Sequence, residues 1–320
     1  GFFQISTTLW VTGSFDNPAG FAACLCAGFP FVGFLLSDSN KYIRYVGGLI
    51  GFVIVIAVIL SQSRAGIMSI AFICFILLNM KFFHKRWVKY LSLLCFALLL
   101  SGCYWMKKDS ADGRLLIWRC SVSMVKDAPW LGHGIGSFEA RYMDYQADYF
   151  RQYGLNRYSM LADNVKHPFN EYLGVLLNFG FVGLLMILAL ITLLIYCYKK
   201  HPCAEKRIAF YSLISIGVFS FFSYTFTYPF TWIVTFLCII ILTKEYIAKV
   251  FTCPIIKNTV CIFILLCSFW GIYNLVKRVM AEKEWGNTSR LALCGASGKT
   301  LPAYAELEKK FENNPYFLYN

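Results

Sequence analysis

Long apolar runs separated by short polar connections dominate the 320-residue chain. A helix needs roughly 20 mainly apolar residues to cross a hydrocarbon core of about 30 Å, and about eight runs approach or reach this length. None alternates as a barrel strand would, and backbone groups in lipid must be paired within the segment, so helices are expected. The runs are 19–36, 43–60, 65–80, 88–105, 172–198, 208–224, 231–242 and 259–276. The pattern predicts an all-α fold, a polytopic transmembrane helical bundle, in which the short seventh run is tilted or joined to the sixth through Pro229.

The composition supports a membrane protein. Apolar residues make up 58% of the chain and charged residues 15%, whereas soluble domains carry about a quarter charged residues. A net charge of +13 would indicate nucleic-acid binding in a soluble chain, but basic cytoplasmic connections explain it better here, so no nucleic-acid partner is expected. The 13 cysteines lie mostly within apolar runs and form no CxxC pair, which argues against a disulfide framework or a zinc site.

The charge of the connections alternates along the chain. Cytoplasmic loops carry the excess of Lys and Arg, so the basic connections are expected in the cytoplasm. Their basic residues are Lys41, Arg44, Lys81, Lys85, Arg86, Lys89, Lys199, Lys200, Lys206, Arg207, Lys244, Lys249 and Lys257. The outward set is then the residues before Pro18, the connections 61–64, 106–168 and 225–229, and the C-terminal tail.

Two outward pieces are extensive. The segment 106–168 is too long for a passive connection, and its amphipathic stretches Leu115–Val125 and Phe138–Phe150 predict a partly helical structure. The expected domains are a transmembrane domain, 1–276, and a polar helical tail, 277–320. Because the chain begins at Gly1 without a methionine, we expect a fragment with further spans upstream.

Three arginines in the outward set are candidate anion ligands. Arg64 lies between two apolar runs, where a charge is costly unless it reaches water or meets a partner. One interpretation is an interfacial arginine whose side chain reaches up to water. The other is an arginine that points into a polar cavity and binds an anion, and the short outward connection favours it. Arg114 is open to the same two interpretations, and Arg119, about one helical turn later, could share its face.

His167 is the candidate base, in the sequence Lys166-His-Pro-Phe-Asn-Glu171, where the long segment re-enters the membrane. Imidazole titrates near neutrality, so a histidine at the edge of a membrane cavity suits proton acceptance from a hydroxyl. A lone histidine is more often structural, and both interpretations stay open. Asn170 and Glu171 lie beside it.

The sequence does not indicate a metal or phosphate-loop site. The carboxylates of the long segment show no Asp-x-Asp spacing, so no metal and no cofactor is expected. The glycine-rich turn Gly132-His-Gly-Ile-Gly136 follows no strand and is followed by no Gly-Lys-Ser/Thr, which argues against a phosphate loop and leaves His133 without an assigned role.

An ordered set of motifs resembles the O-antigen ligase and polymerase superfamily over roughly residues 10–200. The single motifs are degenerate, but their order is specific. They are Gly13-Ser-Phe-Asp-Asn-Pro18, Ser63-Arg-Ala-Gly66, Gly113-Arg-Leu-Leu-Ile-Trp118, Asp127-Ala-Pro-Trp-Leu-Gly132, Gly134-Ile-Gly-Ser-Phe138, His167-Pro-Phe-Asn-Glu-Tyr-Leu173 and Phe179-Gly-Phe-Val-Gly183. The tail, with 303–311 and 313–320, resembles the start of a tetratricopeptide-type region.

The resemblance implies a metal-independent, inverting glycosyltransferase of the bacterial inner membrane that moves a glycan from undecaprenyl pyrophosphate to an acceptor on the periplasmic side. It implies that Arg64 and Arg114 bind the donor pyrophosphate and that His167 activates the acceptor hydroxyl. Asn170 and Arg119 are given supporting roles. Three acceptors remain open: lipid A core for a ligase, a further glycan repeat for a polymerase, and a protein hydroxyl for an O-oligosaccharyltransferase. The ligase is the leading expectation because it is the commonest assignment for these motifs.

A transporter and a structural scaffold are the alternatives from other classes of function. A transporter or flippase of lipid-linked glycans would show inverted repeats and helices broken near the midplane, whereas the polar groups here gather at the outward edge and no internal symmetry is visible. A structural scaffold would leave the ordered set of two arginines and a histidine unexplained. Both are therefore less favoured than the transferase.

Overall fold

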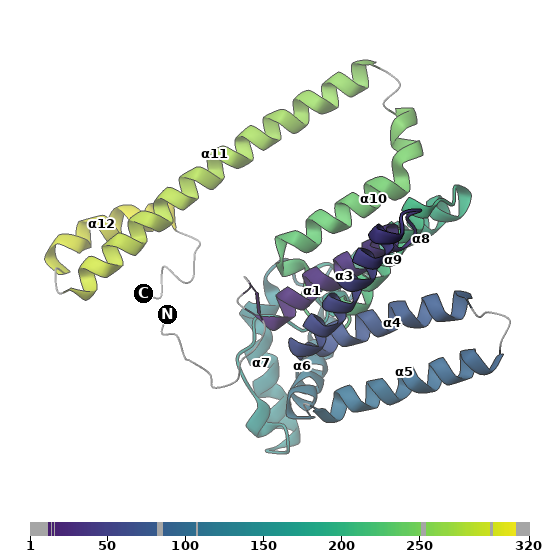
Figure 1. Cartoon of the computed structure of the whole chain (residues 1–320). Coiled ribbons are helices and arrows are strands. Elements are labelled where there is room, and N and C mark those ends of the chain that lie inside the picture. Colours follow the sequence, from purple (N-terminus) through teal and green to yellow (C-terminus); the bar gives the residue numbers. More distant parts are fainter. Residues whose placement is uncertain are drawn as a thin grey trace. The chain divides into compact units, whose positions relative to one another are not determined.

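The computed structural model describes residues 12–13, 15, 17–81, 86–106, 108–250, 254–294 and 297–311, and these are helical with no strand (Figure 1). The predicted motif residues Ser14 and Asp16 and the tail 313–320 lie outside the described residues. The α-helices are α1 Pro18–Gly28, α2 Val32–Leu36, α3 Lys41–Leu60, α4 Arg64–Lys81, α5 Arg86–Met106, α6 Lys108–Asp127, α7 Ser137–Tyr153, α8 Glu171–Lys200, α9 Ala204–Ser220, α10 Pro229–Val250, α11 Pro254–Leu293 and α12 Ser297–Lys310. Three 3₁₀ turns are η1 Phe29–Phe31, η2 Ser159–Leu161 and η3 Thr225–Thr227.

Each predicted apolar run is helical, which confirms the all-α membrane fold. Six helical segments among the described residues are long and apolar enough to cross a membrane: Pro18–Leu36, Lys41–Leu60, Arg86–Trp105, Glu171–Lys200, Pro229–Ala248 and Asn258–Leu293. The third run forms the shorter apolar helix Arg64–Met80, and the sixth forms the 17-residue α9. The helix of the seventh run, α10, extends at both ends beyond the apolar residues 231–242. It begins at Pro229, and a proline fits at the first position of a helix without loss of a hydrogen bond.

Contacts divide the chain into two compact units, 1–244 and 245–320. At the centre of the first unit α9 packs against α1 and α4 through small and polar residues. The Ser215 hydroxyl donates to the Cys26 carbonyl at 2.7 Å, and the Ser69 hydroxyl lies 2.7 Å from that of Ser215. Ser212 likewise donates to the Ala27 carbonyl at 2.6 Å. Such hydrogen bonds between small residues hold membrane helices close together, and here they fix the start of α4.

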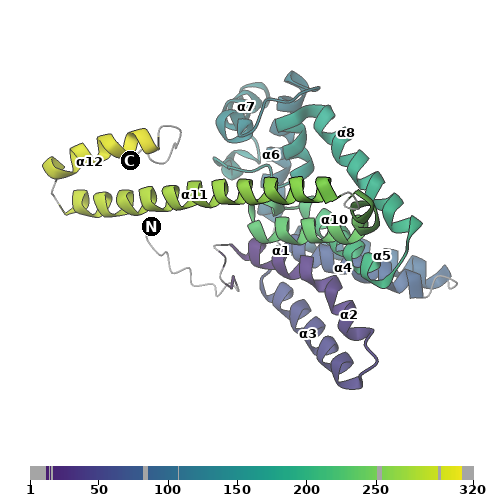
Figure 2. The same cartoon turned by 90° about the horizontal axis from the view of Figure 1, so that it is seen from above.

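The long segment 106–168 is partly helical, as predicted. Figures 1 and 2 show α6 and α7 side by side, and their apolar faces share a core with Leu177 of α8. The core is Leu116, Ile117, Cys120, Met124, Phe138, Tyr142, Tyr158 and Leu177. The segment is therefore a packed cap on the bundle rather than a loose loop.

A break in α8 attaches the glycine-rich turn to the bundle. Gly180 has φ +62° inside α8, so the helix is interrupted there. The freed amides of Phe181 and Val182 donate to the carbonyls of Pro129 and Trp130 at 2.8 and 3.2 Å. In return the amide of His133 donates to the carbonyl of Leu177 at 2.7 Å.

Replacing Gly180 with alanine is expected to destabilise unit 1–244 by about 2–5 kcal/mol, because the added methyl combines left-handed strain with overpacking. Its Cβ would lie 2.3 Å from the Trp130 carbonyl carbon. Gly134→Ala is the matched control, since Gly134 also has a positive φ but nothing lies within 4 Å of an added Cβ. Thermal unfolding in detergent compares the two variants, and an equal loss in both would show that the docking at Gly180 contributes nothing.

The second unit is a helical hairpin in which α12 folds back along the C-terminal part of α11 (Figure 1). Ala281 and Leu307 are buried between the helices, with Trp285 against Phe311, and Lys310 pairs with Glu284 at 2.6 Å. The expected domain boundary at 276/277 falls inside α11, and it stays a prediction. The tetratricopeptide-type tail also stays a prediction.

Candidate functional site

Arg64 is the first residue of α4 and follows a tight turn. Gln62 has φ +51°, an uncommon conformation for a non-glycine residue that costs of order 1–3 kcal/mol and is found most often at functional sites. Ser63 caps the helix, since its hydroxyl accepts from the amide of Gly66 at 3.3 Å. The Arg64 guanidinium donates to the Ser110 hydroxyl of α6 at 2.8 Å. The turn thus directs Arg64 toward the cap formed by the long segment.

Arg114 lies on α6 and its side chain is partly buried. The guanidinium donates to the carbonyl of Phe222 at 2.7 Å and lies 5.0 Å from the ring centre of Phe169. Burial, and after it the nearby charge of Arg64, lower the pKa of Arg114 to about 10, and Tyr224 acts in the opposite direction. Arg114 is still a cation at neutral pH, and none of the ion pairs between described residues includes it. Two neighbouring cations in a desolvated place favour an anion between them.

His167 lies against an aromatic cluster that also reaches Arg114. Its ring stacks on Tyr224 with centroids 4.8 Å apart at 27°. Tyr224 in turn meets the Phe169 ring at 5.3 Å, and its hydroxyl accepts from Asn17 Nδ2 at 2.6 Å. Tyr224 therefore joins the imidazole to the ring beneath the Arg114 guanidinium.

The pKa of His167 is lower than that of an ordinary histidine. Burial is the main cause; Glu139 raises the pKa and Lys166 lowers it. The imidazole is therefore neutral at neutral pH, as a proton acceptor must be.

The residues around His167 are held rigidly. The Pro168 carbonyl accepts from Trp118 Nε1 of α6 at 2.9 Å, and Phe169 has φ +52°. Asn170 caps α8, because its side-chain oxygen accepts from the amide of Leu173 at 3.0 Å. The carboxylate of Glu171 accepts from the amide of Phe226 at 2.7 Å. Asn170 thus has a positional role that capping explains.

The structure brings Arg64, Arg114 and His167 to the same end of unit 1–244, although they are distant in sequence. Residues 49–188 match the sequence model of the O-antigen ligase family, and the match contains all three. This part of the chain is an O-antigen ligase domain. No curated protein matches the chain significantly. The match confirms the resemblance seen in the motifs and supports a membrane glycosyltransferase of the ligase and polymerase type.

Arg119 lies on another face of α6 than Arg114, and its supporting role stays a prediction. Five residues along a helix rotate a side chain by about 140°, so Arg119 leaves the face of Arg114. It is exposed, and it contacts the Tyr149 hydroxyl at 3.4 Å and the Tyr158 ring at 5.2 Å. The expectation that the two arginines share a face is wrong.

His133 has a structural role in the O-antigen ligase domain. Its Nε2 lies 2.8 Å from the Met124 carbonyl near the end of α6, and its Nδ1 lies 3.0 Å from Arg141. An imidazole that donates through Nε2 and accepts through Nδ1 satisfies both contacts. His133 therefore fastens the glycine-rich turn to α6.

Tyr224, Phe169 and Asn17 join the site, although the sequence predicted no role for them. Asn17 and Phe169 lie within the recognised motifs, and this is the signal that could have identified them. Tyr224 is the last residue of an apolar run, where tyrosine is a common interfacial residue, so its contact with His167 gives no local signal.

The site is rich in cations and aromatic rings. Among the described residues no three His, Cys, Asp or Glu side chains converge as metal ligands do. What the arrangement offers chemically is two guanidinium groups for an anion and a neutral imidazole for a proton.

Proposed function

We propose that this O-antigen ligase-type protein transfers a glycan from undecaprenyl pyrophosphate to an acceptor hydroxyl, on the periplasmic side of a bacterial inner membrane and without a metal. The observation that carries the proposal is the convergence of Arg114 and His167 on one aromatic cluster, with the charge of Arg64 close to that of Arg114. The alternation of basic connections supports the sidedness, because the site lies at the less basic ends of the helices.

The arginines suit the pyrophosphate of a lipid-linked donor. Such a lipid holds its anion at the boundary between membrane and water, where Arg64 begins α4. Arginine–phosphate hydrogen bonds are charge-assisted, often bidentate and about twice as strong as neutral ones. The same groups offset the charge that develops on the departing pyrophosphate, which is electrostatic stabilisation of the transition state.

His167 is proposed as the general base. The acceptor oxygen forms a bond to the anomeric carbon as the bond from that carbon to the pyrophosphate oxygen breaks, and the hydroxyl proton goes to the imidazole. Attack from the face opposite the leaving group inverts the anomeric configuration. The stack on Tyr224 holds the ring in place while the proton moves.

The pH profile of transfer tests the state of His167. Because its pKa lies below the ordinary value of 6.5, kcat/KM is expected to be level at neutral pH and to fall with acidification through a midpoint below 6.5. Glu139 and Lys166 are the charges that influence it, with opposite signs. Initial rates between pH 5 and 8 with a fixed donor check this. A midpoint above 6.5, or no acid limb, would contradict it.

A reconstitution assay tests the proposed reaction. The protein in proteoliposomes, supplied with a lipid-pyrophosphate-linked glycan and candidate acceptors, is expected to release the lipid pyrophosphate and yield the glycosylated acceptor with inverted configuration. Movement of the glycolipid across the bilayer without covalent transfer would instead show a flippase.

The acceptor is proposed to be lipid A core, as for a ligase. Glycan analysis of a deletion strain separates the candidates: polymer that accumulates on its lipid carrier indicates a ligase, and loss of long chains with single-repeat caps retained indicates a polymerase. A protein acceptor would show as lost glycopeptides. The tail 277–320, proposed as a separate tetratricopeptide-like region, would suit acceptor or partner recruitment.

A further inference from the structure

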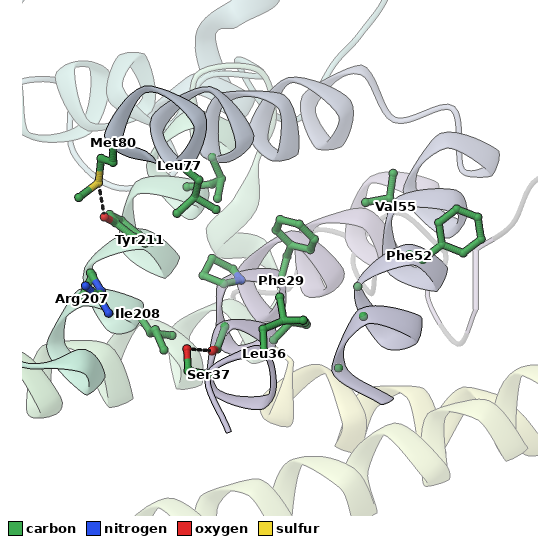
Figure 3. Close-up of a pocket in the computed structure, with 17 residues that line it drawn as sticks. Phe29, Leu36, Ser37, Phe52, Val55, Leu77, Met80, Arg207, Ile208 and Tyr211 are labelled. Carbon is green, nitrogen blue, oxygen red and sulfur yellow. Dashed lines mark hydrogen bonds between the residues drawn. The ribbon is translucent and has the colours of Figure 1, made fainter. Parts of the chain in front are cut away.

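An apolar cavity of about 580 Å³ lies at the other end of unit 1–244 (Figure 3). Met80 at the end of α4 and Ile208 at the start of α9 line it, whereas Arg64 begins α4 and the Phe222 carbonyl follows α9. A helix of 17 residues is roughly 25 Å long, so the cavity and the candidate site lie about a monolayer or more apart. The cavity is therefore separate from the glycan-transfer site.

Three glycines of α3 line the cavity, Gly47, Gly48 and Gly51, together with Leu36 of α2 and Leu77 of α4. A Cβ on Gly47 would lie 2.6 Å from Leu35 Cβ, so α2 packs closely against the helix there. A Cβ on Gly48 would meet no atom within 4 Å, so its side of the cavity is open. The rest of the wall is mostly apolar, which suits a hydrocarbon chain.

Arg207 supplies a positive charge to this apolar cavity. Figure 3 shows it beside Ile208 and Tyr211, and none of the ion pairs between described residues includes it. The polar neighbours have partners of their own: the Tyr211 hydroxyl donates to Met80 Sδ at 2.7 Å and the Ser37 hydroxyl to the Gly33 carbonyl at 2.7 Å. The guanidinium is thus the group that remains to bind a ligand's charge.

We propose that this cavity binds an anionic glycerophospholipid, with the phosphate at Arg207 and an acyl chain among α2, α3 and α4. Charge complementarity selects the occupant. A free phosphate would leave the apolar cavity unfilled, and a zwitterionic lipid would bring a cation of its own to an end of the bundle that is already basic. The surrounding basic connections add long-range attraction to anionic headgroups.

Lipid binding to the delipidated, detergent-purified protein tests the proposal. Native mass spectrometry with phosphatidylglycerol and phosphatidylcholine is expected to show preferential retention of phosphatidylglycerol. Arg207→Gln should weaken that retention about tenfold, as for one lost charge-assisted hydrogen bond. Arg44→Gln is the matched control, because Arg44 is an exposed arginine of α3 that does not line the cavity.

A second variant tests the cavity rather than the charge. Gly48→Leu fills the space and should abolish the retained lipid, whereas Gly102→Leu, at an exposed glycine of α5 with nothing within 4 Å, should not. Equal retention of both lipids by the parent protein would overturn the proposal. So would unchanged retention in Arg207→Gln and Gly48→Leu, or full displacement of the lipid by millimolar inorganic phosphate. Glycan transfer by the Arg207→Gln protein reports that it is folded, independently of lipid retention.

Discussion

His167→Ala is expected to lower the turnover of glycan transfer by about 10²–10⁴-fold, the usual contribution of a positioned general base. The donor KM should change little, because the proposed partner of the imidazole is the acceptor hydroxyl and not the pyrophosphate. Steady-state kinetics with a lipid-linked donor in proteoliposomes measures both parameters. The variant should also lose the acid limb of the pH profile that the base produces.

The control for this variant is His201→Ala. His201 is an exposed histidine that follows α8 at the other end of the bundle, so its loss should leave turnover within about twofold. Because His167 stacks on Tyr224, loss of the ring could also loosen the site; Tyr224→Phe keeps a ring for the stack and should retain most of the activity. Full turnover in His167→Ala at matched expression would remove the general-base role.

Arg114→Met should lower kcat/KM by about 10²-fold or more, since a desolvated charge-assisted contact with phosphate is worth roughly 3 kcal/mol. Arg64→Met should have a similar effect, and the two losses should not add, because both residues bind one anion. Arg114→Lys keeps the charge but not the planar fork, so it should be intermediate. Kinetics over a range of donor concentrations checks the series.

The stability of the Arg114→Met protein distinguishes a binding role from a structural one. Removal of a desolvated charge that lies near a second cation should leave the melting temperature unchanged or raise it, while activity falls. Arg119→Met, on the same helix but exposed and directed elsewhere, is the control and should keep activity within about threefold. A large fall in melting temperature with Arg114→Met would show that Arg114 mainly holds the fold through the Phe222 carbonyl.

The apolar runs were sufficient to predict where the helices lie, but not where a helix is interrupted. Apolar runs predict spans well because the bilayer demands paired backbone groups, and this holds even for α9, which is too short to count among the longest helices. The break at Gly180 could not be predicted, because glycine is common in membrane helices and only the Trp130 carbonyl opposite shows why this one is required.

The site was predictable in part, for a related reason. Arg64, Arg114 and His167 are polar residues at the ends of apolar runs, and their cost in such places makes them visible in sequence. Tyr224 is an aromatic residue in an aromatic-rich chain and lies in none of the motifs, so nothing local marks it. The prediction that Arg119 shares a face with Arg114 was wrong because five residues along a helix rotate a side chain by about 140°.

The contact between Asn17 and Tyr224 joins residues that are 207 positions apart. A membrane protein is inserted from its N-terminus onward, so the two arginines and His167 are synthesised before the ring on which His167 stacks. A nascent chain that ends before η3 therefore lacks the surface that orients its base. The order of synthesis therefore completes the proposed site only when almost the whole of the first unit has been inserted.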